Sequence, residues 1–163
     1  MNIYALLAQS LVYPYPGLLD ELQAGAAAAG KGPAQRKFAA FIKQIGRLSV
    51  TEWEELATRT LDLSPAAAPY VGFQVWGESY QRGAFMAQLN RALAELGIDR
   101  AGELPDHLVP VLRYLAAADQ PLPELAEHLK TALERMIAIL QEKDRRNPYL
   151  HVYEAVLAAL IQH

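Results

Sequence analysis

The sequence predicts an all-α fold, a single-domain helical bundle that spans residues 1–163. Apolar residues recur at intervals of three and four along most of the chain, which is the period of a helix with one buried face. Clusters of proline and glycine separate these segments, and we find no convincing strand and no repeat of 20–50 residues. Apolar residues make up 52% of the sequence, so one core is easily filled. Several helices with short connections favour a bundle.

The first three predicted helices lie between clear breaks. The first covers about residues 3–11 and ends at the Pro14-Tyr15-Pro16-Gly17 stretch. The second runs from Leu18 to about Ala29, where the Gly30-Lys31-Gly32-Pro33 stretch breaks it. The third is amphipathic, and its predicted apolar face carries Phe38, Phe41, Ile42, Ile45 and Leu48.

A capping box predicts the start of the fourth helix. The Thr51 hydroxyl can accept a hydrogen bond from a first-turn amide, and Glu54 can reach back to the Thr51 amide. This helix should run to about Leu61. A loop over 64–69 follows, because Pro65 and Pro69 each disfavour a helical residue before them.

One loop-like run and four further helices are predicted in the rest of the chain. An aromatic, loop-like run over 70–76 precedes a long helix from about Glu78 to Leu96, which Gly97 ends. The next helix ends near Asp119, another covers about 123–143, and the last begins after Asn147-Pro148. The residues expected to face inward from the long helix are Tyr80, Phe85, Met86, Leu89, Leu93 and Leu96.

The composition excludes several classes of function. The chain has no cysteine, which rules out disulfides, thiolate nucleophiles and cysteine-ligated zinc or iron–sulfur clusters. A net charge of -3 argues against a nucleic-acid binder. The N-terminal segment lacks the basic start of a signal peptide, and no apolar stretch reaches the ~18 residues of a transmembrane helix. We therefore expect a cytoplasmic protein. No glycine-rich phosphate loop is present, so we expect no nucleotide, and we expect no other cofactor.

The histidines do not predict a metal site. None of His107, His128, His151 and His163 lies three or four residues from another, and no His-Glu-x-x-His motif occurs. A Ser-His-Asp hydrolase centred on His107 stays open from spacing alone, because its serine can come from anywhere in a chain. However, Asp106 is badly placed to orient His107, since neighbouring helical side chains point about 100° apart. Ser79 also lacks the second glycine of a nucleophile elbow.

Two stretches are unusual. In the first, over 77–83, Glu78 and Arg82 are spaced to form a helical ion pair, and Gly83 inside a helix suggests the close approach of another backbone. In the second, over 103–107, Pro105 favours a helix start and the Asp106 carboxylate is placed to cap it. A capping role leaves a histidine in the first turn unexplained, because the helix dipole disfavours its charged form.

Together these stretches resemble the NarJ-type chaperones, also called the delta subunit of respiratory nitrate reductase, within the TorD-like family. The matching patterns are Gly77-Glu78-Ser79-x-x-Arg82-Gly83-x-x-Met86-x-x-Leu89 and Glu103-Leu104-Pro105-Asp106-His107-Leu108-x-x-x-Leu112. The opening, over 11–22, and the closing Asn147-Pro148-Tyr149 helix are also similar, so the resemblance covers nearly the whole chain. The chain lacks the long, often acidic C-terminal tail of some members.

The resemblance implies an all-helical protein without catalytic turnover. Its members bind the apo catalytic subunit of a molybdenum enzyme in the cytoplasm, recognise an N-terminal leader or its remnant, and keep the subunit open until the molybdenum cofactor is inserted. The positions that match the family motifs are Glu78, Arg82, Glu103, Pro105, Asp106 and His107. Rival interpretations are a TorD-like chaperone for a dimethyl sulfoxide, trimethylamine oxide, formate or selenate enzyme, a helical hydrolase, and a plain scaffold.

A partner peptide would need a groove with apolar walls. The run over 70–76 supplies candidate walls in Tyr70, Phe73 and Trp76, although core packing would explain them equally well. Two acidic surfaces, one of Glu103 and Asp106 and one of Glu52, Glu54, Glu55 and Asp62, would suit a peptide that carries arginine, although we favour a plain solvated face for the second. We expect Asp106 to present its carboxylate at this surface and His107 to make affinity depend on pH. A dimer formed by helix exchange is compatible with the sequence.

Overall fold

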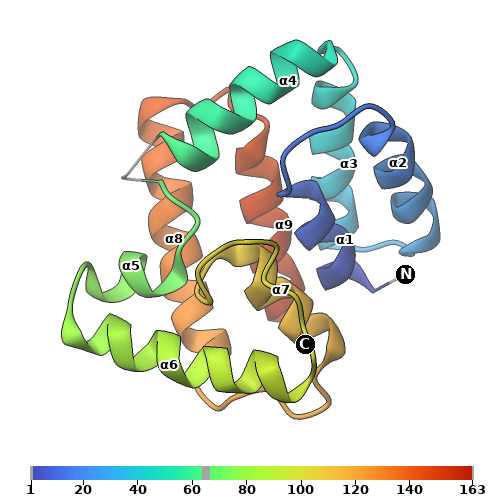
Figure 1. The fold of residues 1–163 in the computed structure, drawn as a ribbon. Helices are drawn as coiled ribbons and strands as arrows, with labels where there is room; N and C mark the ends of the chain where they lie inside the picture. Colours follow the sequence, from blue (N-terminus) through green and yellow to red (C-terminus); the bar gives the residue numbers. More distant parts are fainter. Residues whose placement is uncertain (1, 64–66, 163) are drawn as a thin grey trace.

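Helix α9 (Tyr149–Gln162) lies in the middle of the molecule, with α1, α3 and α8 packed directly against it (Figure 1). The computed structural model describes residues 2–63 and 67–162. Within these ranges the chain forms nine α-helices and one π-helical segment, η1, and no β-strand, which confirms the predicted all-α bundle. The other elements are α1 (Ile3–Ser10), α2 (Leu18–Ala28), α3 (Pro33–Ile45), α4 (Val50–Ala57), η1 (Thr58–Asp62), α5 (Val71–Trp76), α6 (Tyr80–Glu95), α7 (Leu108–Ala117) and α8 (Leu125–Lys143).

Helix α9 is central because its apolar residues surround most of its circumference. Its buried residues are Tyr149, Leu150, Val152, Tyr153, Ala155, Val156 and Ala159. Small alanines among them let neighbouring helices approach closely, while the two tyrosines fill the space at the α3 and α4 end. A helix that is apolar nearly all round is stable only inside other helices.

An aromatic cluster joins α3, α4 and α9. The Phe41 ring contacts Phe38, Trp53 and Tyr149, with ring centroids 5.3 Å apart for the Phe41–Tyr149 pair. The Trp53 indole N–H donates a hydrogen bond to the Tyr149 hydroxyl at 3.0 Å. Burial raises the pKa of Tyr149, so its hydroxyl stays neutral inside the cluster while its oxygen accepts the bond from Trp53. The cluster is thus packed and also satisfied in its polar atoms.

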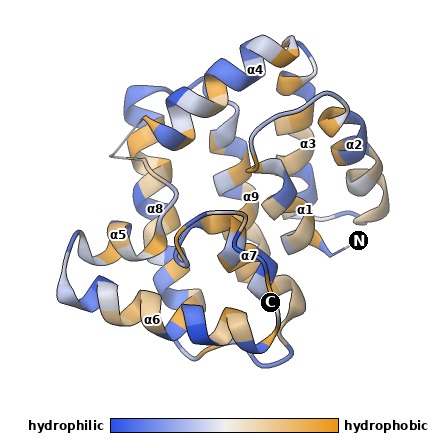
Figure 2. Cartoon of the chain, in the orientation of Figure 1, coloured by the Kyte–Doolittle hydropathy of each residue, from blue (hydrophilic) through white to orange (hydrophobic). Residues whose placement is uncertain are grey.

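Helices at the outside of the molecule have one apolar face. Figure 2 shows apolar and polar residues mixed along α4 and α6, as expected for helices that cover a core. On α6, Phe85, Leu89 and Leu93 are buried as predicted. Tyr80, at 92% exposure, and Leu96, at 47%, are exposed, so the prediction that they face inward is wrong. They lie at the two ends of the helix, where the side chains extend beyond the elements that cover the middle of α6.

Two other local predictions need correction. Ser49, not Thr51, is the N-cap of α4, and the reciprocal bonds of the capping box run between Ser49 and Glu52. The segment predicted as a loop over 70–76 instead forms α5, which Gly77 ends with a left-handed φ of 67°. The predicted loop around Pro65 lies partly outside the described residues. No helix in the described ranges combines the length and hydropathy that a bilayer crossing requires.

Candidate functional site at the meeting of α5, α6 and α7

A short backbone bridge brings the two unusual sequence stretches together. Tyr70 and His107 form an isolated antiparallel bridge. On one side of it the Val71 amide donates to the Asp106 carbonyl at 2.8 Å, and on the other the Leu108 amide donates to the Pro69 carbonyl at 2.8 Å. The starts of α5 and α7 are therefore fixed to each other, although they are far apart in the sequence.

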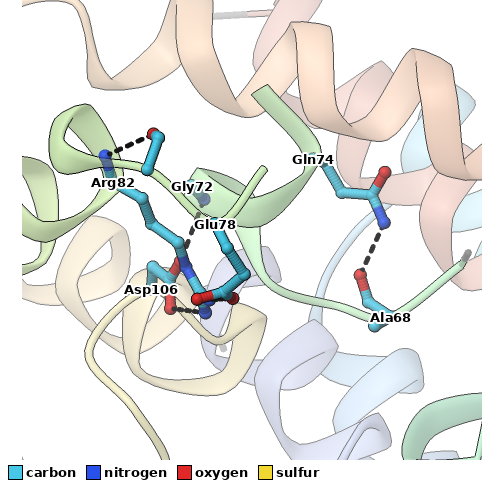
Figure 3. Close-up of polar contacts among 7 residues, drawn as sticks. Ala68, Gly72, Gln74, Glu78, Arg82 and Asp106 are labelled. Atoms are coloured by element: carbon cyan, nitrogen blue, oxygen red, sulfur yellow. Dashed lines mark hydrogen bonds and ion pairs between the residues drawn. The ribbon is translucent and has the colours of Figure 1, made fainter. Parts of the chain in front are cut away.

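The Asp106 side chain is fully buried behind this bridge (Figure 3). Its Oδ2 accepts hydrogen bonds from the Gly72 amide and from Arg82 Nε, each at 3.0 Å, and its Oδ1 accepts from Arg82 Nη2 at 3.3 Å. Two-point pairing of this kind is the strong form of an arginine–carboxylate contact. Asp106 therefore neither caps α7 nor reaches the surface, so both of these predictions are wrong.

Arg82 connects α6 to this buried carboxylate. Its guanidinium also pairs with Glu78 one helical turn earlier, which confirms the predicted ion pair, and lies 5.6 Å from the Tyr70 ring centroid and 5.7 Å from that of Phe73. Burial alone would lower the pKa of Arg82, but the hydrogen bonds and charges of Asp106 and Glu78 outweigh it and raise the pKa. Arg82 is thus a fixed cation that holds α5, α6 and the start of α7 together.

Close packing against a glycine occurs at Gly72 rather than at Gly83, and the neighbours are side chains rather than another backbone. A Cβ atom built on Gly72 would lie 2.8 Å from Asp106 Oδ2 and 2.9 Å from Arg82 Cγ. A Cβ atom on Gly83 would meet nothing within 4 Å. The Gly83 prediction is therefore wrong. The only sequence signal for Gly72 was a single glycine between Val71 and Phe73 in an aromatic run.

Helix α5 has additional anchors on its other side. The Gln74 side-chain amide donates to the Ala68 carbonyl at 3.0 Å (Figure 3). Arg135 of α8 donates to the carbonyls of Gln74 and Val75, which are among those that a helix leaves unpaired at its C-terminus. These contacts explain how six residues remain helical, since isolated helices of this length are unstable in water.

His107 is the N-cap of α7. Its Nδ1 accepts a hydrogen bond from the Val109 amide at 3.0 Å, so the neutral ring carries its proton on Nε2. Burial lowers the pKa of His107, and the charges of Glu103, Asp106 and Asp62 offset only part of this effect. A second proton would have to bind at Nδ1 and would break the cap. This accounts for the first-turn histidine that the sequence left unexplained.

His107 borders a groove that runs along α1 and α7. A cavity of about 180 Å³ beside the ring is lined by Asp62 and Glu103 together with apolar side chains. A second cavity of about 570 Å³ shares Val12 and Tyr13 with it. We call the two cavities the α1–α7 groove. Its lining residues are Ala5, Ala8, Gln9, Leu11, Val12, Tyr13, Tyr15, Ala57, Leu61, Asp62, Ala101, Glu103, His107, Val109 and Arg113.

Charge is distributed unevenly along this groove. Asp62 and Glu103 lie at the His107 end, and Arg113 lies at the other end. Glu103 accepts a hydrogen bond from the Tyr70 hydroxyl at 3.1 Å, and burial with the Glu103 charge raises the pKa of Tyr70 to about 12. The groove therefore has an apolar middle and an acidic end, which suits a peptide with an apolar face and a basic residue.

The predicted site residues do not form one surface. Tyr70, Phe73, Glu78, Arg82, Glu103, Asp106 and His107 belong to one connected network, and Pro105 is buried beside it. Trp76 lies apart, in a cavity of about 490 Å³ where it contacts Phe85 and His128. Within the network only His107 and Glu103 line the α1–α7 groove. The groove residues of α1 were not among the predicted site residues.

The geometry does not provide a catalytic dyad at the motif. The Asp106 carboxylate bonds Arg82 and Gly72 rather than the His107 ring, and the Nδ1 atom that an aspartate would orient is used by Val109. In the described ranges, no three His, Asp or Glu side chains gather as ligands for a metal ion. The bonds of Asp106 instead hold the starts of α5 and α7 in place beside the α1–α7 groove.

Comparison with protein families identifies the family to which the chain belongs. The family model described as the nitrate reductase delta subunit matches residues 24–151, which include both motifs and the Asn147-Pro148-Tyr149 helix start. The similar opening over 11–22 lies outside this match. No curated protein matches the chain at a significant level. Because the family model covers most of the chain, the chain belongs to the nitrate reductase delta subunit family, a family of chaperones rather than of enzymes.

Proposed function

We propose that this protein is a cytoplasmic chaperone that binds the apo catalytic subunit of respiratory nitrate reductase through its N-terminal, leader-like segment and promotes insertion of the molybdenum cofactor. The observation that carries the proposal is the position of the α1–α7 groove, which lies directly against the Glu103-x-Pro105-Asp106-His107 motif. Family membership supports the chaperone role, and the groove supplies a place for a peptide.

In this proposal the leader binds as an amphipathic helix. Its apolar face packs against Val12, Tyr13 and Val109, and a basic residue lies near Asp62 and Glu103. The Nε2–H of His107 is a suitable donor to the peptide, because no described residue accepts a hydrogen bond from it. Asp106 and Arg82 are positioning residues, since both are buried and hold α5 and α7 at the groove wall.

Titration of the purified protein with the leader peptide of the co-encoded catalytic subunit tests the proposal. We expect binding, and we expect the Asp62→Asn, Glu103→Gln double variant to weaken it about tenfold by removing two carboxylates from the acidic end. The matched control is Asp119→Asn, Glu127→Gln, which removes two exposed carboxylates outside the groove. Absence of binding, or equal loss in both double variants, would contradict the proposal.

The alternative client is another exported molybdoenzyme. The same groove would serve a TorD-like chaperone for a dimethyl sulfoxide, trimethylamine oxide, formate or selenate enzyme. A panel of leader peptides from these enzymes, titrated under the same conditions, separates the clients. Preference for one of them over the nitrate reductase leader would replace nitrate reductase as the client while leaving the groove as the binding site.

A further inference from the structure

Helix α4 lies at the opposite end of the molecule from α6 (Figure 1), and a second groove lies beside α4. It has a volume of about 830 Å³ and is formed by the end of α3, by α4, by η1 and by the connection between α8 and α9. It shares no lining residue with the α1–α7 groove. We call it the arginine groove, and its lining residues are Gln44, Arg47, Leu48, Glu52, Glu55, Leu56, Arg59, Arg145, Arg146 and Pro148.

The charge of the arginine groove is opposite in sign to the net charge of the molecule. Four arginines and two glutamates line it, whereas the chain carries a net charge of -3. Arg59 pairs with Asp144 at 3.3 Å. Arg47, Arg145 and Arg146 are exposed and form no ion pair with any described residue. One glutamate, Glu52, already accepts a hydrogen bond from the Ser49 amide. The lining therefore carries a net positive charge on an acidic protein, and three of its arginines have no ion-pair partner among the described residues.

The floor of the groove is apolar. Leu48 and Pro148 are half-buried and Leu56 is buried, whereas Arg47, Arg145 and Arg146 are exposed, so a ligand would meet carbon atoms at the bottom and guanidinium groups nearer the solvent. Apolar contact in the centre with charged contact at the rim is the usual arrangement of a protein–protein interface. It complements a helix that has one apolar face flanked by aspartate or glutamate.

The backbone near the groove does not favour a compact anion such as phosphate. Small anions bind where helix N-termini offer free amides. Here the start of α4 is capped by Ser49, and the Tyr149 amide at the start of α9 donates to Asn147 Oδ1 at 2.9 Å. The available donors are thus long, exposed side chains spread over three elements, which suits an extended partner better than a small one.

We propose that the arginine groove is a second docking site, which binds an acidic amphipathic helix of a partner polypeptide. This goes beyond the proposed leader site, because it lies on a different surface and selects the opposite charge. Binding there is steered by the guanidinium groups and is weakened by salt, as expected for exposed charge pairs. Both grooves can be occupied at the same time.

A synthetic acidic peptide tests this proposal. The probe is a fluorescent helical peptide of about five turns (~18 residues) with leucines on one face and glutamates beside them. We expect it to bind this acidic protein, and we expect Arg145→Glu, Arg146→Glu to weaken binding by about tenfold or more. The matched control is Arg91→Glu, Arg100→Glu, which makes the same charge change at exposed positions outside the groove and should change binding less than twofold.

Two altered peptides and two competitors complete the experiment. Replacing the glutamates with lysine, or the leucines with glutamine, should each abolish binding, and equal binding of either altered peptide would overturn the proposal. Saturation of the groove by inorganic pyrophosphate, with the same sensitivity to the Arg145 and Arg146 substitutions, would show a small-anion site instead. Displacement of the acidic peptide by the leader peptide would show that there is only one groove. Failure of the leader to bind would count against the proposed function alone.

Discussion

At the scale of single residues, the buried Arg82–Asp106 pair depends on the absence of a side chain at Gly72. The Gly72 amide reaches Asp106 because the backbone of α5 lies against the carboxylate, at a distance where a methyl group does not fit. Gly83 has no such role, since the space beside it is open. The two glycines therefore respond to alanine in opposite directions.

Gly72→Ala should destabilise the protein by about 1–3 kcal/mol, because the added methyl group displaces Asp106 or Arg82. Gly83→Ala should stabilise it by up to about 1 kcal/mol, since alanine is the better helix former and meets no neighbour. Urea unfolding of the two variants beside the wild type measures both effects. Similar shifts for the two variants would mean that the backbone of α5 is not held against Asp106.

Asp106→Ala should cost about 3–5 kcal/mol, because it leaves the buried Arg82 guanidinium without its carboxylate. Asp99→Ala is the control, since it removes an exposed partner of Arg113 and should cost less than about 1 kcal/mol. In a double-mutant cycle, Arg82→Met should recover much of the loss caused by Asp106→Ala. Additive losses would show that the pair is not coupled.

His107 should make stability fall with acid. Its pKa is lowered in the folded protein, so its contribution is complete above the unfolded value of about 6.5 and is lost as the pH falls below it. His107→Asn keeps an oxygen at the N-cap and does not titrate, so its unfolding free energy should decline less between about pH 6.5 and 5. Equal slopes for wild type and variant in urea titrations at several pH values would refute this origin.

At the scale of elements, helix starts were harder to predict than helices. The sequence located both ends of α2 and α8 and the start of α9 to within about two residues, whereas the predicted apolar face of α3 continued to Leu48, past the end of the helix at Ile45. It missed α5, whose six residues are held in part by hydrogen bonds from Arg135 of α8, far away in the sequence. It also assigned the cap of α4 to Thr51, since Ser49-x-x-Glu52 and Thr51-x-x-Glu54 both resemble a capping box.

Substitution of each candidate N-cap residue shows which of the two overlapping capping-box patterns starts α4. Ser49→Ala should cost about 1 kcal/mol, because it removes the acceptor of the Glu52 amide bond. Thr51→Ala lies within the first turn of α4, is exposed, and should leave stability unchanged or slightly higher. Thermal unfolding of both variants measures this, and a larger loss for Thr51→Ala would place the start of α4 two residues later.

At the scale of the whole molecule, α9 is the helix on which the others depend. It packs against α1, α3 and α8, and Tyr149 joins it to α4 through the Trp53 bond. Helix α2 packs mainly on α1 and α3, and its buried residues are Leu18, Leu22 and Gly25. The sequence predicted the apolar stripe of each helix, but it did not contain the pairing of Arg82 with Asp106 or of Tyr70 with His107, because those pairings arise only when α5 and α7 meet.

Hydrogen exchange should follow this arrangement. Amides in the middle of α9 should exchange only through global unfolding, because opening this helix exposes the whole core. Amides in α2 should exchange much faster, since this helix can open without disturbing α8 or α9. Mass spectrometry of exchange under native conditions measures both, and protection in α2 equal to that in α9 would contradict the proposed hierarchy.

The bridge between Tyr70 and His107 also has a topological consequence. It ties together the two ends of the segment that holds α5 and α6, so this segment leaves the bundle and returns to it at one fixed point. The turn over 97–102 lies inside this closed segment, between the end of α6 and the residues that lead to His107. Extra residues inserted there lengthen a closed excursion, and their entropic cost grows only with the logarithm of its length. The exposed Gly97, which precedes the groove residue Ala101, is therefore the position at which to graft a reporter or an affinity handle while both ends of the segment stay tied.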